Sequence, residues 1–212
     1  RDNSKVQEAI FSSLFPKHPY GTQTVLGTQE NLKNPSITNI KNYYKQWYVP
    51  NNMAICMSGD LDPDATIALI DKYFGGLKPN PELPKLDLPK EAPITQPVVK
   101  EVLGPDAESV ALAWRFPGVS DKDFEILQVV SQVLYNGKAG LIDLDLNQQQ
   151  KVLNSYGYPM GLADYSALLL GGLPKQGQTL EEVKDLLLSE IKKLRAGEFD
   201  EKMLEANINN FK

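Results

Sequence analysis

The sequence predicts an α+β fold, with a mixed or antiparallel sheet and helices packed on one face. Strand patterns occur in neighbouring pairs and are followed by helix patterns in pairs, as in hairpin-built sheets. A regular strand–helix–strand alternation would instead indicate a parallel sheet. Six prolines lie between Pro79 and Pro97, and proline interrupts both helices and central strands. We therefore expect two partial lobes, 1–78 and 98–212, joined by a proline-rich linker at 79–97.

Composition excludes several classes of function. The 212 residues are 42% apolar and 23% charged, which is typical of a globular chain long enough to bury a core. The net charge of −5 opposes nucleic-acid binding, because phosphate contacts need clustered Lys and Arg. The longest apolar runs are far shorter than the roughly 20 residues of a membrane span. We expect neither a nucleic-acid partner nor a membrane span.

The first lobe is expected to contain three helices and one strand. Apolar residues recur at helical spacing in three stretches, 6–14, 37–47 and 63–74. Ser36 and Asp62 precede the second and third stretches and are expected to be their N-caps. Between these two helices, Met53–Ser58 is a short apolar run bounded by turn residues, which predicts a buried strand.

The second lobe is expected to follow the order β, β, α, α, β, β, α, α. The predicted strands are Val98–Leu103, Val110–Phe116, Val152–Leu162 and Ser166–Leu170. The predicted helices are one capped by Ser120 and ending at Asn136-Gly137, a short one at 141–149, one opened by the capping box Thr179–Glu182, and one after Asp200.

His18 and Cys56 are the single histidine and the single cysteine of the chain. These counts exclude an internal disulfide and a zinc site of the usual His and Cys donors. His18 lies in a loop, Lys17–Gly21, where a structural role is favoured over that of a general base or metal ligand. Cys56 is expected to pack in the Met53–Ser58 strand as a small hydrophobic residue rather than act as a nucleophile.

Two short motifs resemble ligand loops but lack essential residues. Asp60, Asp62 and Asp64 alternate as in a calcium loop, yet Ala65 stands where the motif needs glycine, Asp71 holds the twelfth position and the stretch contains Pro63, so helix capping explains them better. The stretch 136–140 resembles a phosphate loop without its Gly-Lys-Ser/Thr ending. A helix C-cap followed by a turn is the favoured interpretation of that stretch.

Several tyrosines invite comparison with a stacking platform for nucleic acid. The last three of them have no interleaved basic residues, so core or interface packing is the favoured interpretation. The residues concerned are Tyr43, Tyr44, Tyr156, Tyr158 and Tyr165.

The order of several weak motifs resembles the pitrilysin/insulinase family of zinc metallopeptidases. In the first lobe they are His-Pro-Tyr-Gly at 18–21, Gly27, Leu32, Ile37, Ile40, Tyr43-Tyr44, 48–53, Gly59-Asp60 and 73–77. In the second lobe they are 111–116, 121–134, 137–141 and 197–204. The resemblance covers essentially the whole chain. It implies lobes like those of mitochondrial processing peptidase, with 1–78 as the latter part of a metal-domain-type lobe and 98–212 as the first part of a metal-free one.

The resemblance also implies a chemistry that this chain lacks. Active members carry an inverted His-x-x-Glu-His motif that binds zinc and activates a water, with a further glutamate ligand downstream. His18 is followed by Pro19 rather than that spacing, so no catalytic or metal residue is carried over, and substrate-binding residues are left unassigned. The loop at 137–140 matches in position a glycine-rich segment that contacts substrate in some partner subunits, but it is much shorter. Zinc and a peptide substrate are implied for the parent protein only.

We interpret the chain as an interior piece of such a peptidase, inactive by itself. It begins at Arg1 without an initiator Met and ends inside a helical pattern. Its partners would be the remaining lobes of the same polypeptide or a homologous subunit, and uncovered sheet edges could give a homo-oligomer. Two alternatives stay open: a non-catalytic partner or scaffold subunit of the same family, and an unrelated α+β binding domain.

Overall fold

The computed structural model describes residues 2–211 and divides the chain into two compact units. One unit combines Arg1–Pro16 with Ala92–Lys212, and the other is Lys17–Glu91. The first helix therefore groups with the segment that follows the linker, whereas the sequence pattern placed it in the first lobe. The two units are described separately below.

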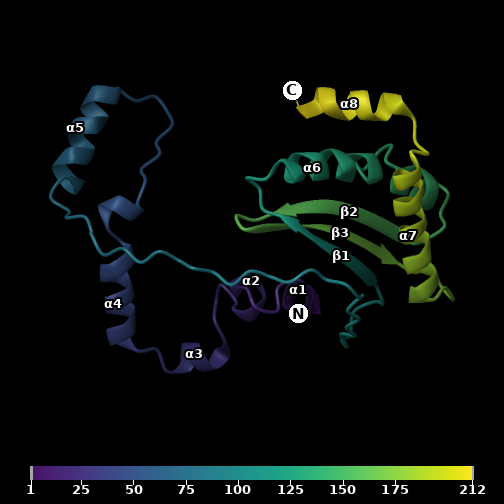
Figure 1. Ribbon diagram of the computed structural model, residues 1–212, viewed down its shortest axis with the longest axis horizontal. Helices are drawn as coiled ribbons and strands as arrows, with labels where there is room; N and C mark the ends of the chain where they lie inside the picture. The colour runs from purple at the N-terminus through teal and green to yellow at the C-terminus, as the bar shows by residue number, and fades with distance from the viewer. Residues whose placement is uncertain (1, 212) are drawn as a thin grey trace. The chain divides into compact units, whose positions relative to one another are not determined.

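The larger unit is built on a three-stranded antiparallel sheet (Figure 1). Its strands are β1 (Val110–Pro117), β2 (Asn154–Gly161) and β3 (Tyr165–Leu173), in the order β1-β3-β2. Both outer strands pair with β3 along its length, so β3 is the central strand. The predicted α+β class with an antiparallel sheet is confirmed.

The helices of this unit begin and end close to their predicted positions. They are α1 (Asp2–Leu14), α6 (Lys122–Leu134), the π-helix η2 (Asp143–Gln148), α7 (Leu180–Ala196) and α8 (Glu201–Phe211). The Thr179–Glu182 capping box opens α7 as predicted, and Gly197 ends it with φ of 74°. None of the described helices is long and apolar enough to cross a bilayer.

The N-cap of α6 is Asp121, so the prediction of Ser120 was wrong by one residue. The Asp121 carboxylate accepts a hydrogen bond of 2.9 Å from the Asp123 N–H. A carboxylate at this position satisfies an unpaired N–H and also carries a charge that the helix N-terminus favours. The helix ends at Leu134 rather than at Asn136-Gly137, because Tyr135 is already extended.

The hydrophobic core lies between one face of the sheet and helices α6 and α7. The β3 residues Leu168 and Leu170 point into it and are almost fully buried. The other buried members are Leu127, Leu134, Leu141, Ile142, Leu146, Val152, Val183 and Leu187. Alternate residues of β1 complete this layer: Val110, Leu112, Trp114 and Phe116.

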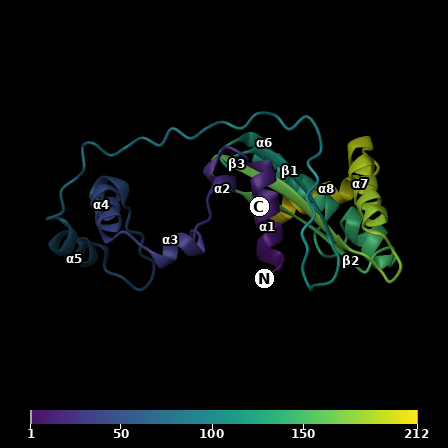
Figure 2. The same cartoon turned by 90° about the horizontal axis from the view of Figure 1, so that it is seen from below.

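The opposite face of the sheet carries the end of α1 (Figure 2). The Arg115 guanidinium donates to the main-chain carbonyls of Leu14 and Ala92. It also lies over the Tyr165 ring, which packs against Phe15 with the ring centroids 5.6 Å apart. One side chain of β1 thus joins two segments that are far apart in the sequence, the end of α1 and the end of the linker.

The smaller unit, Lys17–Glu91, consists of short helices without a sheet among its described residues. They are α2 (Pro19–Thr22), α3 (Gln29–Lys33), α4 (Ile37–Trp47), the 3-10 turn η1 (Pro50–Asn52) and α5 (Pro63–Phe74). Ser36 and Asp62 cap α4 and α5 as predicted. The apolar faces of these two helices are exposed, including Ile37, Ile40, Tyr44, Ile67 and Tyr73.

Two predicted strands are not formed. Met53–Ser58 and Val98–Leu103 have no strand assignment, and most of their apolar side chains are exposed. A strand needs a neighbour to bond its main chain, and the described residues give neither segment a paired strand. Both predictions were therefore wrong for this chain.

Substitution of Gly172 by alanine is expected to destabilise the larger unit by about 1–3 kcal/mol, because it overpacks the core. An added Cβ would lie 2.5 Å from Cγ1 of Val183, whose side chain is fully buried and has no room to move. The measurement is the urea unfolding midpoint of Gly172→Ala. Gly76→Ala is the control, since its Cβ would meet nothing within 4 Å. Equal midpoints for the two variants would contradict the packing described.

Candidate functional site

His18 has a structural role at the start of α2. Its Nδ1 accepts a hydrogen bond of 3.2 Å from the Tyr20 N–H, and its ring packs edge-on against the Tyr20 ring. Its side chain is almost fully buried. The Glu91 carboxylate accepts bonds of 2.7 Å from the main-chain N–H groups of both Lys17 and His18. This N-cap geometry supports the structural interpretation of His18.

Cys56 lies in an exposed segment, so the prediction of a packed thiol was wrong. The segment Met53–Ser58 alternates large and small residues, with Met53, Ile55 and Met57 all exposed. Such alternation suits a strand inside a sheet, and without that sheet the thiol has nothing to pack against.

Capping explains two of the three alternating aspartates, Asp62 and Asp64. Oδ1 of Asp62 accepts a hydrogen bond of 2.8 Å from the Ala65 N–H at the start of α5. Asp64 lies in the first turn, where a negative charge is favourable. This arrangement supports the capping interpretation over the calcium loop.

The glycine loop at 136–140 encloses a carboxylate that belongs to the chain itself. Oδ2 of Asp143 accepts hydrogen bonds of 3.0 Å from the N–H groups of Asn136, Gly137 and Gly140. Oδ1 of Asn136 accepts hydrogen bonds from the N–H groups of Lys138 and Ala139, the two residues between Gly137 and Gly140. The N–H groups that could cradle a phosphate are therefore already bonded. Turn formation, with Gly137 at φ of 78°, explains this loop.

The tyrosines take part in local packing in each unit. In the smaller unit, the Tyr44 and Tyr48 rings stack at 4.7 Å, and Tyr43 lies against Trp47. In the larger unit, the Tyr156 ring lies over Gly171, where a Cβ would come within 2.3 Å of it. Burial raises the pKa of the Tyr156 hydroxyl. Tyr43, Tyr44 and Tyr158 are exposed, so they are not core residues and their interface role stays a prediction, whereas Tyr156 and Tyr165 are half-buried.

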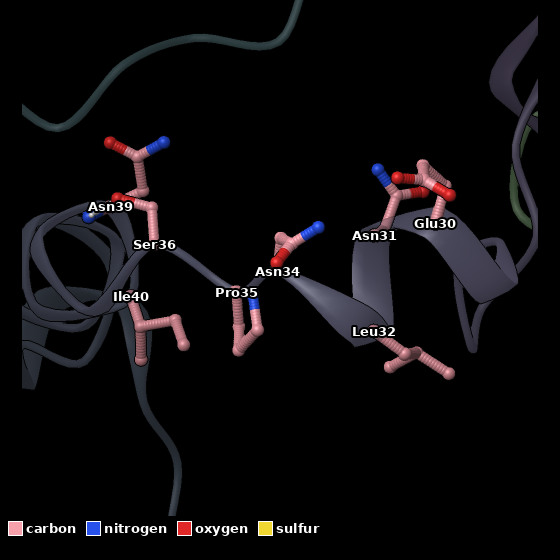
Figure 3. Close-up of a pocket in the computed structure, with 8 residues that line it drawn as sticks. All are labelled: Glu30, Asn31, Leu32, Asn34, Pro35, Ser36, Asn39 and Ile40. Atoms are coloured by element: carbon pink, nitrogen blue, oxygen red, sulfur yellow. Dashed lines mark hydrogen bonds between the residues drawn. The ribbon is translucent and has the colours of Figure 1, made fainter.

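A shallow hollow of about 570 Å³ lies between α3 and α4 (Figure 3). Its lining consists of Glu30, Asn31, Leu32, Asn34, Pro35, Ser36, Asn39 and Ile40. Glu30 is the ionisable group among them, so the hollow lacks an acid–base pair. The amides and two aliphatic side chains do not define a reaction.

A charged cluster of Asp145, Glu190 and Lys193 joins η2 to α7. The Lys193 ammonium donates to both carboxylates, and Glu190 is almost fully buried. The hydrogen bond from Lys193 lowers the pKa of the Asp145 carboxyl, while burial raises the pKa of Glu190. The hydrogen bond to Asp145 raises the pKa of Lys193 in turn. The sequence pattern did not predict this cluster. Glu190 and Lys193 lie within one helical turn of each other, but Asp145 is distant from both in the sequence.

Zinc chemistry does not fit the described residues. Within residues 2–211, no group of three or more His, Cys, Asp or Glu side chains is placed to hold a metal ion. The Nδ1 atom of His18, one of its two possible donors, already accepts the Tyr20 N–H. The residues that the structure describes therefore support no catalytic step through a metal.

The sequence matches the family described as "Peptidase M16 inactive domain" over residues 36–211. The chain belongs to the peptidase M16 family. The assignment to the pitrilysin/insulinase family made from the motifs is confirmed. The chain corresponds to an inactive domain of this zinc-protease family, and the match spans both structural units.

Two curated relatives agree with this assignment. The "Zinc protease PqqE" of Helicobacter pylori is 26% identical over 203 residues, which cover 92% of this chain and 45% of that protein. A probable mitochondrial-processing peptidase subunit beta of Schizosaccharomyces pombe is 29% identical over 85 residues, covering 40% of this chain and 18% of the relative. The chain thus spans about half the length of its curated Helicobacter relative.

Solved structures show the same fold. A protease from Helicobacter pylori has a TM-score of 0.75 at 23% identity, over 97% of this chain and 55% of that chain. Pitrilysin has a TM-score of 0.61 at 18% identity, over 96% of this chain and 23% of that chain.

Removal of the Asp145 carboxylate is expected to reduce the dependence of stability on pH. Because the pKa of Asp145 is lowered in the folded chain, its contribution is present above its ordinary pKa and is lost as the pH falls. Asp145→Asn should therefore lose about 1 kcal/mol at neutral pH and progressively less in acid.

The measurement is the urea unfolding midpoint of each variant, determined at several pH values from neutral to about pH 3. Glu190 acts in the opposite direction, because its raised pKa gives stability that disappears as the pH rises. The exposed Asp87 provides the matched control Asp87→Asn, with which the slope of Asp145→Asn is compared. An unchanged slope in Asp145→Asn would contradict the role of the cluster.

Proposed function

We propose that this chain is a non-catalytic, substrate-enclosing segment of a pitrilysin/insulinase-type zinc metallopeptidase. The parent protein would bind zinc and cleave peptides or unfolded polypeptides inside a closed chamber, while residues 1–212 supply part of its wall. The observation that carries this proposal is the match to the inactive-domain family over residues 36–211. The zinc-protease names of the relatives support zinc in the parent.

The local chemistry agrees with inactivity of this segment. A zinc peptidase needs several metal ligands and a base that activates the bound water. The described residues offer no such cluster, and His18 is engaged as a helix cap. We assign no catalytic, metal or substrate-binding residue to this chain.

The lobe boundaries of the proposal follow the sequence. Residues 1–78 would be the latter part of the metal-domain-type lobe, 79–97 the linker, and 98–212 the first part of the metal-free lobe. The exposed apolar faces of α4 and α5 support an incomplete first lobe, because amphipathic helices normally cover a sheet or another helix.

A second candidate is a non-catalytic partner or scaffold subunit. The relative of Schizosaccharomyces pombe is named as a subunit of a processing peptidase, which favours pairing of homologous chains in the family. The metal content of the purified parent distinguishes the two proposals: stoichiometric zinc supports the peptidase, and its absence supports the partner subunit.

We expect the isolated chain to bind no stoichiometric zinc and to leave an unstructured peptide uncleaved. The measurements are zinc content after dialysis against the metal, and cleavage of a fluorogenic peptide. His18→Ala, checked for folding by circular dichroism, should behave as the wild type in both. Stoichiometric zinc binding or cleavage that disappears in His18→Ala would overturn the inactive-segment proposal.

A further inference from the structure

The chain contains one Asn-Gly pair, Asn136-Gly137, and this pair lies in the loop between α6 and η2. Asparagine is chemically labile, and a following glycine favours its deamidation because glycine has no side chain to hinder attack by its own nitrogen on the preceding amide. Gly137 is exposed to solvent and Asn136 is half-buried. The pair is therefore accessible to the water that deamidation consumes.

Deamidation at this pair joins the main chain to the side chain before water opens the ring again. The Gly137 N–H gives its proton to solvent, and the nitrogen attacks Cγ of Asn136. The Cγ–Nδ2 bond then breaks, and Nδ2 leaves as ammonia after taking a proton from solvent. Water adds to either carbonyl of the resulting succinimide, which yields aspartate or isoaspartate at position 136. One water is consumed and one ammonia is released, with no change of oxidation state.

The loop engages both reacting groups in hydrogen bonds. Oδ2 of Asp143 accepts the Gly137 N–H at 3.0 Å. Oδ1 of Asn136 accepts from two further N–H groups of the loop, and Nδ2 donates to the Gln132 carbonyl at 3.1 Å. Because the reaction needs a free Gly137 nitrogen and a departing Nδ2, the bonds to Asp143 and Gln132 must break first.

The negative charge of Asp143 opposes the same reaction. The attacking form of Gly137 is its deprotonated nitrogen, and a carboxylate at hydrogen-bond distance disfavours a second negative charge. Asp143 is almost fully buried, so solvent screens this repulsion only weakly. Its Oδ2 atom also accepts from the N–H groups of Asn136 and Gly140, which closes the loop on both sides of the pair.

We propose that Asn136-Gly137 is a deamidation site controlled by Asp143. Asn136 is protected while Asp143 holds the loop closed, and it is converted when the loop opens. The product opposes closure, because a carboxylate oxygen in place of Nδ2 faces the Gln132 carbonyl and adds a negative charge to the loop that encloses Asp143. Modification thus makes an opening of this loop irreversible. The site does not depend on the proposed peptidase function.

Mass spectrometry of the tryptic peptide Asp123–Lys138, in which Asn136 is the single asparagine, measures the reaction. The chain is incubated at mildly alkaline pH, either without denaturant or in guanidinium chloride. We expect the wild type to deamidate about tenfold or more slowly without denaturant, because hydrogen bonds to a charged acceptor hold the loop closed. Equal rates in the two conditions would overturn the proposal.

Asp143→Asn keeps the size of the side chain and removes its charge. Without denaturant, Asn136 should deamidate several-fold faster in this variant than in the wild type. Asp145→Asn is the matched control, since it removes a carboxylate of the same helix that bonds to Lys193 and Gln149 rather than to the loop. This control should deamidate at close to the wild-type rate.

Circular dichroism verifies that both variants are folded, and the comparison of the wild type in the two conditions needs neither variant. A wild-type rate in Asp143→Asn would overturn the proposal. Equal acceleration in the two variants would do the same, because it would assign the protection to the stability of the larger unit rather than to the contact of Asp143 with the loop.

Asn136→Asp reproduces one product of the reaction and tests its effect on the loop. Its urea unfolding midpoint should lie below that of the wild type, because the Gln132 carbonyl loses its donor and the loop gains a negative charge. The exposed Asn3 provides the control Asn3→Asp, which introduces the same charge elsewhere in the larger unit. A midpoint of Asn136→Asp equal to that of the wild type would overturn the proposed irreversibility.

Discussion

Strand β3 bonds to a neighbour along both sides and is covered on both faces, so its side chains must be apolar or small almost everywhere. Its residues 166–172 are buried. Gly171 allows the Tyr156 ring to lie against one face, and Gly172 allows Val183 to approach the other. A central strand satisfies its main-chain groups only if both neighbours are present. The larger unit therefore depends on β1 and β2 reaching β3 from either side.

The other elements of this unit are arranged so that they cover the two faces of β3. Helices α6 and α7 cover one face, and the charged cluster of Asp145, Glu190 and Lys193 fixes η2 against α7 at its margin. The end of α1 lies on the other face, where Arg115 holds its last carbonyl. The smaller unit has no equivalent strand among its described residues, and its amphipathic helices expose their apolar faces. The larger unit therefore has a buried core, whereas the helices of the smaller unit leave their apolar faces uncovered.

Local features of the fold could be predicted from the sequence, while non-local pairing could not. Ser36, Asp62 and Thr179 were recognised as caps because a cap is decided by the residues within one turn of it. Met53–Ser58 and Val98–Leu103 have the composition of strands, but a strand exists only where a distant segment bonds to it. The Asp143 carboxylate inside the glycine loop and the pairing of Asp145 with Lys193 were missed for the same reason. Family membership was recognisable because it rests on the order of many weak local motifs, which the family match over 36–211 confirms.

Hydrogen exchange of the isolated chain tests the central claim that the larger unit has a stable core built on β3, whereas the smaller unit has no strand among its described residues. Amides of Tyr165–Leu173 should exchange slowly, at rates approaching those of global unfolding. Amides of Met53–Ser58 should exchange rapidly, because no described strand bonds to this segment. Equal protection of the two segments in the isolated chain would contradict the account.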